Sequence, residues 1–246
     1  MADSSVPEKQ ITDFVAQLRE AAGANLESVV LYGSAVCGDY HPDYSNVNLL
    51  VILKDTSLPK LLAIAPAVSK WTGHKRNAPL LISRAELERS ADVFSIELLD
   101  MQLQHRVLHG PDPLASLQIP RHLHRAQLEY ELREKLILLR QRLLTEYKDA
   151  KHTWDLLLRS LPAFTTLFRH ALIAQGQPTP ATKREAVKAL AALLAFDESP
   201  FENLLDIREH RAHPRQFLVQ DVASRYLAAV EQVTAAVDRI LDSPGG

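Results

Sequence analysis

Apolar residues alternate between strand-like and helical spacings through the first half of the chain. Near the N-terminus Ile11, Phe14, Val15 and Leu18 recur at helical intervals, and Gly23 then gives a stop. Short apolar runs bounded by turn residues predict strands farther along. We expect strands at residues 28–31, 47–53, 78–82, 93–99 and 107–110, with helices at 58–71 and 83–90. This alternation predicts an α/β domain in the first 115 residues.

Only helical periodicity continues in the second half. Pro111, Pro113 and Pro120 mark the change. Beyond them, apolar positions predict helices at 123–147, 153–174, 182–194, 200–210 and 217–241. We therefore expect two domains, with an α/β domain at 1–115 and an all-α helical bundle at 116–246.

Composition and charge narrow the classes of partner. Of the 246 residues, 46% are hydrophobic and 24% are charged, which is typical of a globular protein, and the net charge of −2 gives no indication of a nucleic-acid partner. The single cysteine, Cys37, allows no intramolecular disulfide. The N-terminus lacks a signal-like apolar core, and the most apolar stretch, 61–68, is too short to span a bilayer. We expect a cytoplasmic protein without a membrane partner, of undetermined oligomeric state.

One segment has the pattern of a ligand site. The first predicted strand ends in Gly33-Ser34, and the second strand begins with Asn46 and Asn48. Because strand side chains alternate between faces, the two amides are expected on the same side. Glycine permits close approach of a ligand, and backbone N–H groups around Gly33 and Ser34 can hold an anion. The alternatives are an ordinary tight turn with a helix cap, and polar residues at a strand edge.

This arrangement resembles the nucleotidyltransferases of the DNA polymerase β superfamily, in which Gly-Ser is followed, after a gap of about this length, by Asp-x-Asp in an apolar strand. The resemblance covers residues 28–100. It implies a mixed sheet with flanking helices, and nucleotide binding at Gly33 and Ser34. The helical second half resembles minimal and aminoglycoside-type nucleotidyltransferases in architecture. In the family a third carboxylate on a later strand completes a site for two Mg²⁺ ions, and Glu97 is the best match for this catalytic, metal-binding residue.

The sequence departs from the family where the metal is bound. Asn46-Val47-Asn48 replaces Asp-x-Asp. With Glu97 as third member, the charge of the ligand set falls from about −3 to about −1, and Mg²⁺ favours carboxylates. We expect a degenerate site of Asn46, Asn48 and Glu97, with weak or absent Mg²⁺ binding. The nearby acids Asp39 and Asp43 are interpreted as turn residues, although they are also candidates for completing the site.

Three functions are compatible with these residues. The preferred one is a nucleotidyltransferase-fold protein that binds a nucleoside triphosphate or another phosphate compound and has weak or no transferase activity. The second is an active Mg²⁺-dependent nucleotidyltransferase that modifies a small molecule or a protein, with its metal held by Glu97, the substrate phosphates and Asp43. The third is a non-enzymatic, antitoxin-like module whose helical domain binds a protein partner.

Three other signals have both a functional and an ordinary interpretation. Arg208 and His213 have the spacing of the Arg-x(4–6)-His motif of HEPN ribonucleases, but they also fit a basic helix end before a proline stop. The segment 74–76, His-Lys-Arg, can attract phosphates or face water. Cys37 follows the Gly-Ser turn, but no base is evident beside it.

Overall fold

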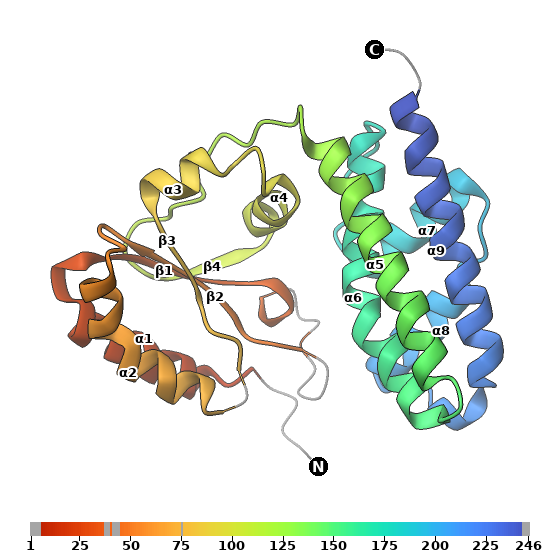
Figure 1. Ribbon diagram of the computed structural model, residues 1–246, viewed down its shortest axis with the longest axis horizontal. Helices are drawn as coiled ribbons and strands as arrows, with labels where there is room; N and C mark the ends of the chain where they lie inside the picture. The colour runs from red at the N-terminus through yellow and green to blue at the C-terminus, as the bar shows by residue number, and fades with distance from the viewer. Residues whose placement is uncertain (1–5, 37–39, 41–44, 75, 243–246) are drawn as a thin grey trace. The chain divides into compact units, whose positions relative to one another are not determined.

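The computed structural model describes residues 6–36, 40, 45–74 and 76–242. The chain divides into two compact units, Met1–Arg121 and His122–Gly246. Figure 1 shows strands and short helices in the first unit, and helices in the second. The predicted fold class, an α/β domain with a mixed sheet followed by a helical bundle, is confirmed.

A mixed sheet forms the centre of the first unit. Its strands are β1 (Leu26–Tyr32), β2 (Asn48–Leu53), β3 (Leu80–Ser83) and β4 (His105–His109), in the order β3-β2-β1-β4. β1 is antiparallel to both β2 and β4, whereas β2 is parallel to β3. The end of β1 therefore lies at the same end of the sheet as the starts of β2, β3 and β4. We call this the Gly33 end.

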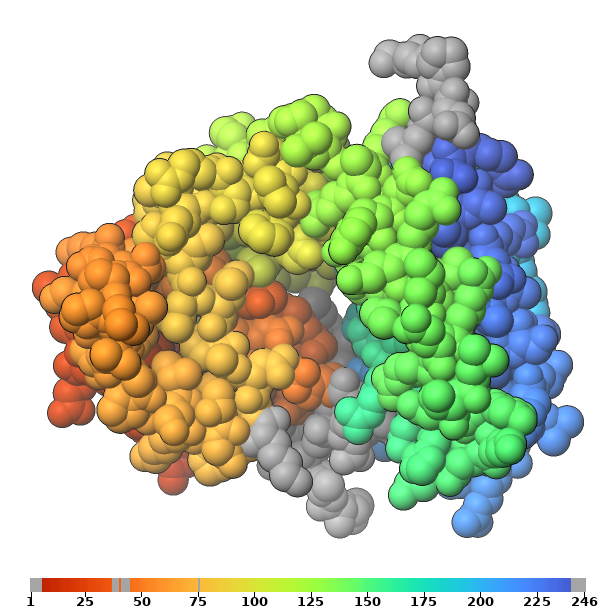
Figure 2. Space-filling view, viewed as in Figure 1, coloured from red at the N-terminus to blue at the C-terminus, as the bar shows by residue number. Residues whose placement is uncertain are grey.

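Helices cover both faces of the sheet. Figure 1 shows α1 (Glu8–Ala22) and α2 (Leu58–Thr72) on one side, and α3 (Arg84–Arg89) and α4 (Ser95–Leu103) on the other. Two separate hydrophobic clusters fill the layers between helices and sheet. β2 is buried on both sides after its first residue, as its continuous apolar run predicts. On the face visible in Figure 2, α2 and the segment leading into β3 form much of the surface of this unit.

Because side chains alternate along a strand, the residue number determines on which face of the sheet each polar side chain lies. Val30 and Leu50 pack with the cluster under α3 and α4, whereas their neighbours Leu31 and Leu49 pack under α1 and α2. Asn48 lies two residues before Leu50, so it belongs to the α4 face. Tyr32, two residues after Val30, also packs against that cluster.

One predicted strand, 93–99, is wrong because residues 95–99 begin α4, and Val93 and Phe94 lie in the turn before it. The buried residues of α4 are Ser95, Ile96, Leu98 and Met101, while the apolar Val93 and Phe94 are exposed. The position beside β1 is occupied by β4 instead. The predicted short helix after β3 is confirmed as α3, with a capping box between Ser83 and Glu86.

The second unit is a bundle of five α-helices within the described residues. They are α5 (His124–Glu146), α6 (Ala150–Ala174), α7 (Lys183–Leu194), α8 (Ser199–Arg208) and α9 (Val219–Asp242). Its core includes an aromatic cluster in which Phe201 lies 5.0 Å from Phe168 and 4.6 Å from Tyr226, measured between ring centroids. The predicted helices are confirmed, and a capping box of Thr182 and Glu185 begins α7. Across the described residues of both units, no helix has the length and apolarity needed to cross a bilayer.

Candidate functional site

The Gly33 turn lies directly against Asn48. After Tyr32 the chain bends through a short 3₁₀ turn, Gly33–Ala35, which the Val36 N–H closes by donating to the Gly33 carbonyl at 2.9 Å. Gly33 has φ +77°, and a Cβ added there would lie 2.9 Å from Nδ2 of Asn48. The backbone conformation therefore favours glycine, and a side chain at this position would push the Asn48 amide away from the bend.

Strand register explains this contact. Tyr32 is the antiparallel partner of Asn48, so the Asn48 side chain lies beside the residue that follows Tyr32. Ser34 is half-buried within the same turn. Asn46 is exposed and lies outside the strand, which begins at Asn48 rather than at Val47. The described contacts thus join Asn48 to the bend, while the placement of Asn46 beside it stays a prediction.

Glu97 approaches this site from α4 and not from a strand. Its side chain is exposed on the helix. Burial raises the pKa of the Tyr32 hydroxyl, and the nearby charge of Glu97 raises it further. Glu97 therefore lies within electrostatic range of the last residue of β1. The sequence pattern alone did not single out Tyr32 as a site residue. Its position two residues after Val30, on a buried strand, indicates that it lies on the same face of the sheet.

The described donor set fits Mg²⁺ poorly. Among the described residues, no group of three or more His, Cys, Asp or Glu side chains is placed to hold a metal ion. β3, the parallel neighbour of β2, consists of Leu-Leu-Ile-Ser and carries no carboxylate. An amide from Asn48 and one carboxylate from Glu97 make a weak set for a hard cation. Asp39, Asp43 and Cys37 lie outside the described residues.

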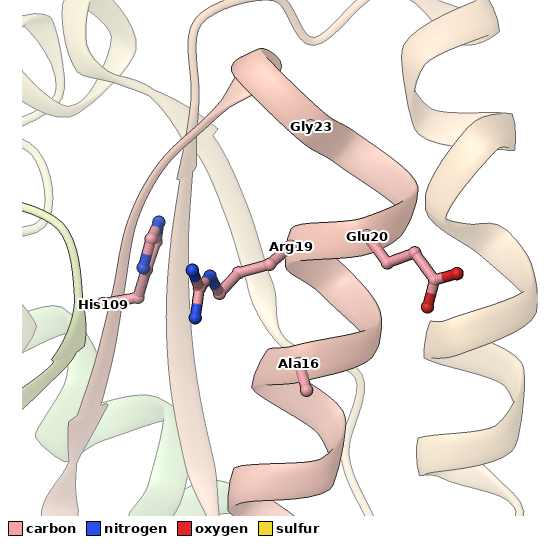
Figure 3. A pocket seen from close by; sticks show the side chains of 5 residues that line it. All are labelled: Ala16, Arg19, Glu20, Gly23 and His109. Carbon is pink, nitrogen blue, oxygen red and sulfur yellow. The ribbon is translucent and has the colours of Figure 1, made fainter.

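A surface hollow of about 470 Å³ lies away from these residues (Figure 3). It is lined by Ala16, Arg19, Glu20, Gly23 and His109. The Arg19 side chain extends toward His109, and Glu20 lies on the other side of the helix. His109 is the last residue of β4 and Gly23 precedes the start of β1, so the hollow is at the opposite end of the sheet from Gly33.

In the second unit, Arg208 and His213 serve the bundle itself. Arg208 is buried, and its Nη1 donates to the Leu158 carbonyl at 2.9 Å. His213 begins a 3₁₀ turn, where its Nδ1 accepts from the Arg215 N–H at 3.1 Å. These contacts favour the structural interpretation of the motif over a ribonuclease site.

Comparison with solved structures identifies a protein of the same architecture. Spectinomycin adenyltransferase AAD(9) from Enterococcus faecialis, crystallised with ATP and spectinomycin, is similar with a TM-score of 0.51 and 16% sequence identity. The similarity covers 96% of this chain and 99% of that chain, and therefore includes both units. The chain has the nucleotidyltransferase fold. No protein-family model and no curated protein sequence matches it. At this level of identity the similarity establishes the fold and not the chemistry of the Gly33 end.

Proposed function

We propose that this protein binds a nucleotide through its phosphates at the Gly33–Ser34 bend and has weak or no transferase activity. One observation carries the proposal: the amide of Asn48 lies against Gly33, where the family resemblance places a metal-binding carboxylate. Asn46, Asn48 and Glu97 then form a degenerate metal site.

The chemistry of the bend supports binding without efficient transfer. Backbone around a glycine with positive φ can approach phosphate oxygens closely, and its N–H groups carry partial positive charge. Phosphoryl-type transfer depends on positioning and on charge neutralisation, to which Mg²⁺ contributes strongly. Neutral amides bind Mg²⁺ weakly, so the phosphate charge would be neutralised less during transfer. The contacts between the phosphates and the backbone N–H groups would remain.

Binding is tested by thermal denaturation with ATP, GTP, CTP and UTP, each with Mg²⁺ and with EDTA. We expect at least one nucleotide to raise the melting temperature, with similar shifts under both conditions, because ligand binding to the folded state stabilises it. A shift that requires Mg²⁺ would contradict a degenerate metal site.

Transfer is tested with labelled nucleotides in the wild type and in the double variant Asn46→Asp/Asn48→Asp. We expect metal-dependent labelling or pyrophosphate release in the double variant alone. Equal activity in the wild type would refute the loss of function at these two positions.

A second candidate is an active Mg²⁺-dependent nucleotidyltransferase that modifies a small molecule or a protein. It is favoured by the proximity of Glu97 to Tyr32 and by the similarity to an adenyltransferase crystallised with ATP and an antibiotic. This function predicts Mg²⁺-dependent pyrophosphate release that Glu97→Gln abolishes. Glu88→Gln, an exposed position on α3, is the matched control and leaves it unchanged.

A further inference from the structure

The segment between α2 and β3 contains an arginine, Arg76, whose side chain is held in a fixed position. The guanidinium of Arg76 lies over the ring of Trp71, with Cζ 4.2 Å from the ring centroid. Trp71 is itself immobilised, because it stacks on Phe14 at 4.6 Å and its Nε1–H donates to the Asn77 carbonyl at 2.9 Å. A guanidinium stacked on a buried indole loses little further freedom when it binds a ligand.

Part of this guanidinium is buried without a hydrogen-bond acceptor. Within the described part of the chain, Nη1 of Arg76 is buried and has no hydrogen-bond partner. Burial lowers the pKa of Arg76, and the nearby Tyr40 acts in the opposite direction. Buried donors are nearly always paired, and a charged donor is the most costly to leave unpaired. An anionic acceptor would satisfy this atom.

Topology puts Arg76 at the Gly33 end of the sheet. β3 begins at Leu80, four residues after Arg76, and runs parallel to β2 with Leu80 opposite Leu50. The segment that enters β3 therefore lies at the Gly33 end of the sheet. Trp71 packs on the face covered by α1 and α2, where Val36 and Tyr40 beyond the bend also pack, whereas Asn48 lies on the other face. Tyr40, which interacts with Arg76, belongs to the connection that leaves this turn.

We propose that Arg76 binds the phosphate chain of the nucleotide and supplies positive charge that a metal ion supplies in active relatives. This inference rests on the proposed function, since it assigns a residue to the same phosphate site. A planar guanidinium can donate two parallel hydrogen bonds to phosphate oxygens, so it suits a site whose amide side chains hold a metal weakly.

Calorimetric titration in EDTA tests the assignment with ATP, inorganic tripolyphosphate and adenosine as probes. We expect Arg76→Gln to weaken ATP and tripolyphosphate binding by roughly tenfold or more, as for loss of a charged hydrogen bond, and to leave any adenosine binding unchanged. Arg76→Lys keeps the charge but cannot donate two parallel hydrogen bonds, so its affinity for ATP should lie between those of the wild type and Arg76→Gln. Arg19→Gln is the matched control: it removes the same charge from an exposed guanidinium of the same unit, at the opposite end of the sheet from Gly33.

The results separate the two proposals. A wild type that binds neither ATP nor tripolyphosphate overturns both the nucleotide site and the role of Arg76. A wild type that binds both, beside an equally tight Arg76→Gln variant, overturns only the role of Arg76. Circular dichroism of each variant checks that it is folded.

A second readout does not depend on the folding of an Arg76 variant. The chain has two tryptophans, Trp71 and Trp154, so Trp154→Phe leaves the indole beneath Arg76 as the sole tryptophan fluorophore. Saturation with tripolyphosphate should change the emission of Trp71, because the phosphate pairs with the cation stacked on it. Saturating binding with unchanged emission would contradict contact with Arg76.

Discussion

At the residue scale, the Gly33 end combines a backbone conformation that favours glycine with a neutral amide beside it. Gly33 has φ +77°, and a Cβ added there would lie 2.9 Å from Nδ2 of Asn48, so the end of that side chain would have to move. Asn48 has nearly the size and shape of an aspartate but no charge. Asn48 thus places a neutral amide beside the bend, and a hard cation binds a neutral amide more weakly than a carboxylate.

Gly33→Ala should destabilise the first unit and weaken nucleotide binding. A non-glycine residue with positive φ costs about 1–2 kcal/mol, and the added Cβ would displace the Asn48 amide from the bend. Urea unfolding measures the loss of stability, and titration with ATP measures the loss of affinity.

Gly23→Ala is the control for backbone strain alone. Gly23 also has positive φ, but an added Cβ there meets nothing within 4 Å. If both variants lose the same stability and neither loses affinity for ATP, the Gly33 turn does not bind the nucleotide.

At the scale of elements, the capping box of α3 makes stability depend on pH. The backbone N–H of Ser83 donates to Oε2 of Glu86 at 2.7 Å, and the Glu86 N–H donates to Oγ of Ser83 at 3.2 Å. The bond from the Ser83 backbone, followed by that with its side chain, lowers the pKa of Glu86. The stabilisation is therefore complete above the ordinary glutamate pKa of about 4.3 and disappears as the pH falls through the lower value of the folded state.

Glu86→Ala should lower the urea midpoint of the first unit at pH 7, and this difference from wild type should shrink toward pH 3. Glu88→Ala, exposed on the same helix, should show no such pH-dependent difference. A Glu86→Ala defect that stays constant from pH 7 to pH 3 would show that the carboxylate charge makes no contribution.

Most elements could be predicted from local signals, whereas the site depended on pairing between distant segments. Both capping boxes and the apolar run of β2 are local features of the sequence, and they begin or form elements at the predicted places. The segment 93–99 was predicted as a strand because Val93 and Phe94 are apolar, but both are exposed in the turn before α4. Asn48 beside Gly33 was predictable from the family motif, but Glu97 on α4 and Arg76 on Trp71 depend on how helices pack against the sheet.

At the scale of the whole molecule, the two units have separate hydrophobic interiors. The first is built on the two faces of a sheet, and the second on an aromatic cluster between helices. The proposed phosphate site uses residues of the first unit only. Damage to the bundle core should therefore affect stability more than it affects nucleotide binding.

Phe201→Ala should reduce the unfolding free energy of the second unit by about 3–5 kcal/mol, because Phe201 is fully buried and its removal leaves a cavity. Leu218→Ala, at a residue that is 77% exposed, should have little effect. Scanning calorimetry with and without ATP measures both quantities, and the ATP-induced shift of the first unit should persist in Phe201→Ala. Loss of that shift in a folded variant would show that the bundle takes part in binding.

The Asn48 amide beside the Gly33 turn also has a consequence at the level of the gene. Codons for asparagine and aspartate differ by a single base, and exchanging these side chains requires no repacking of strands or helices. A gene encoding this chain is therefore two point mutations away from acidic side chains at both positions.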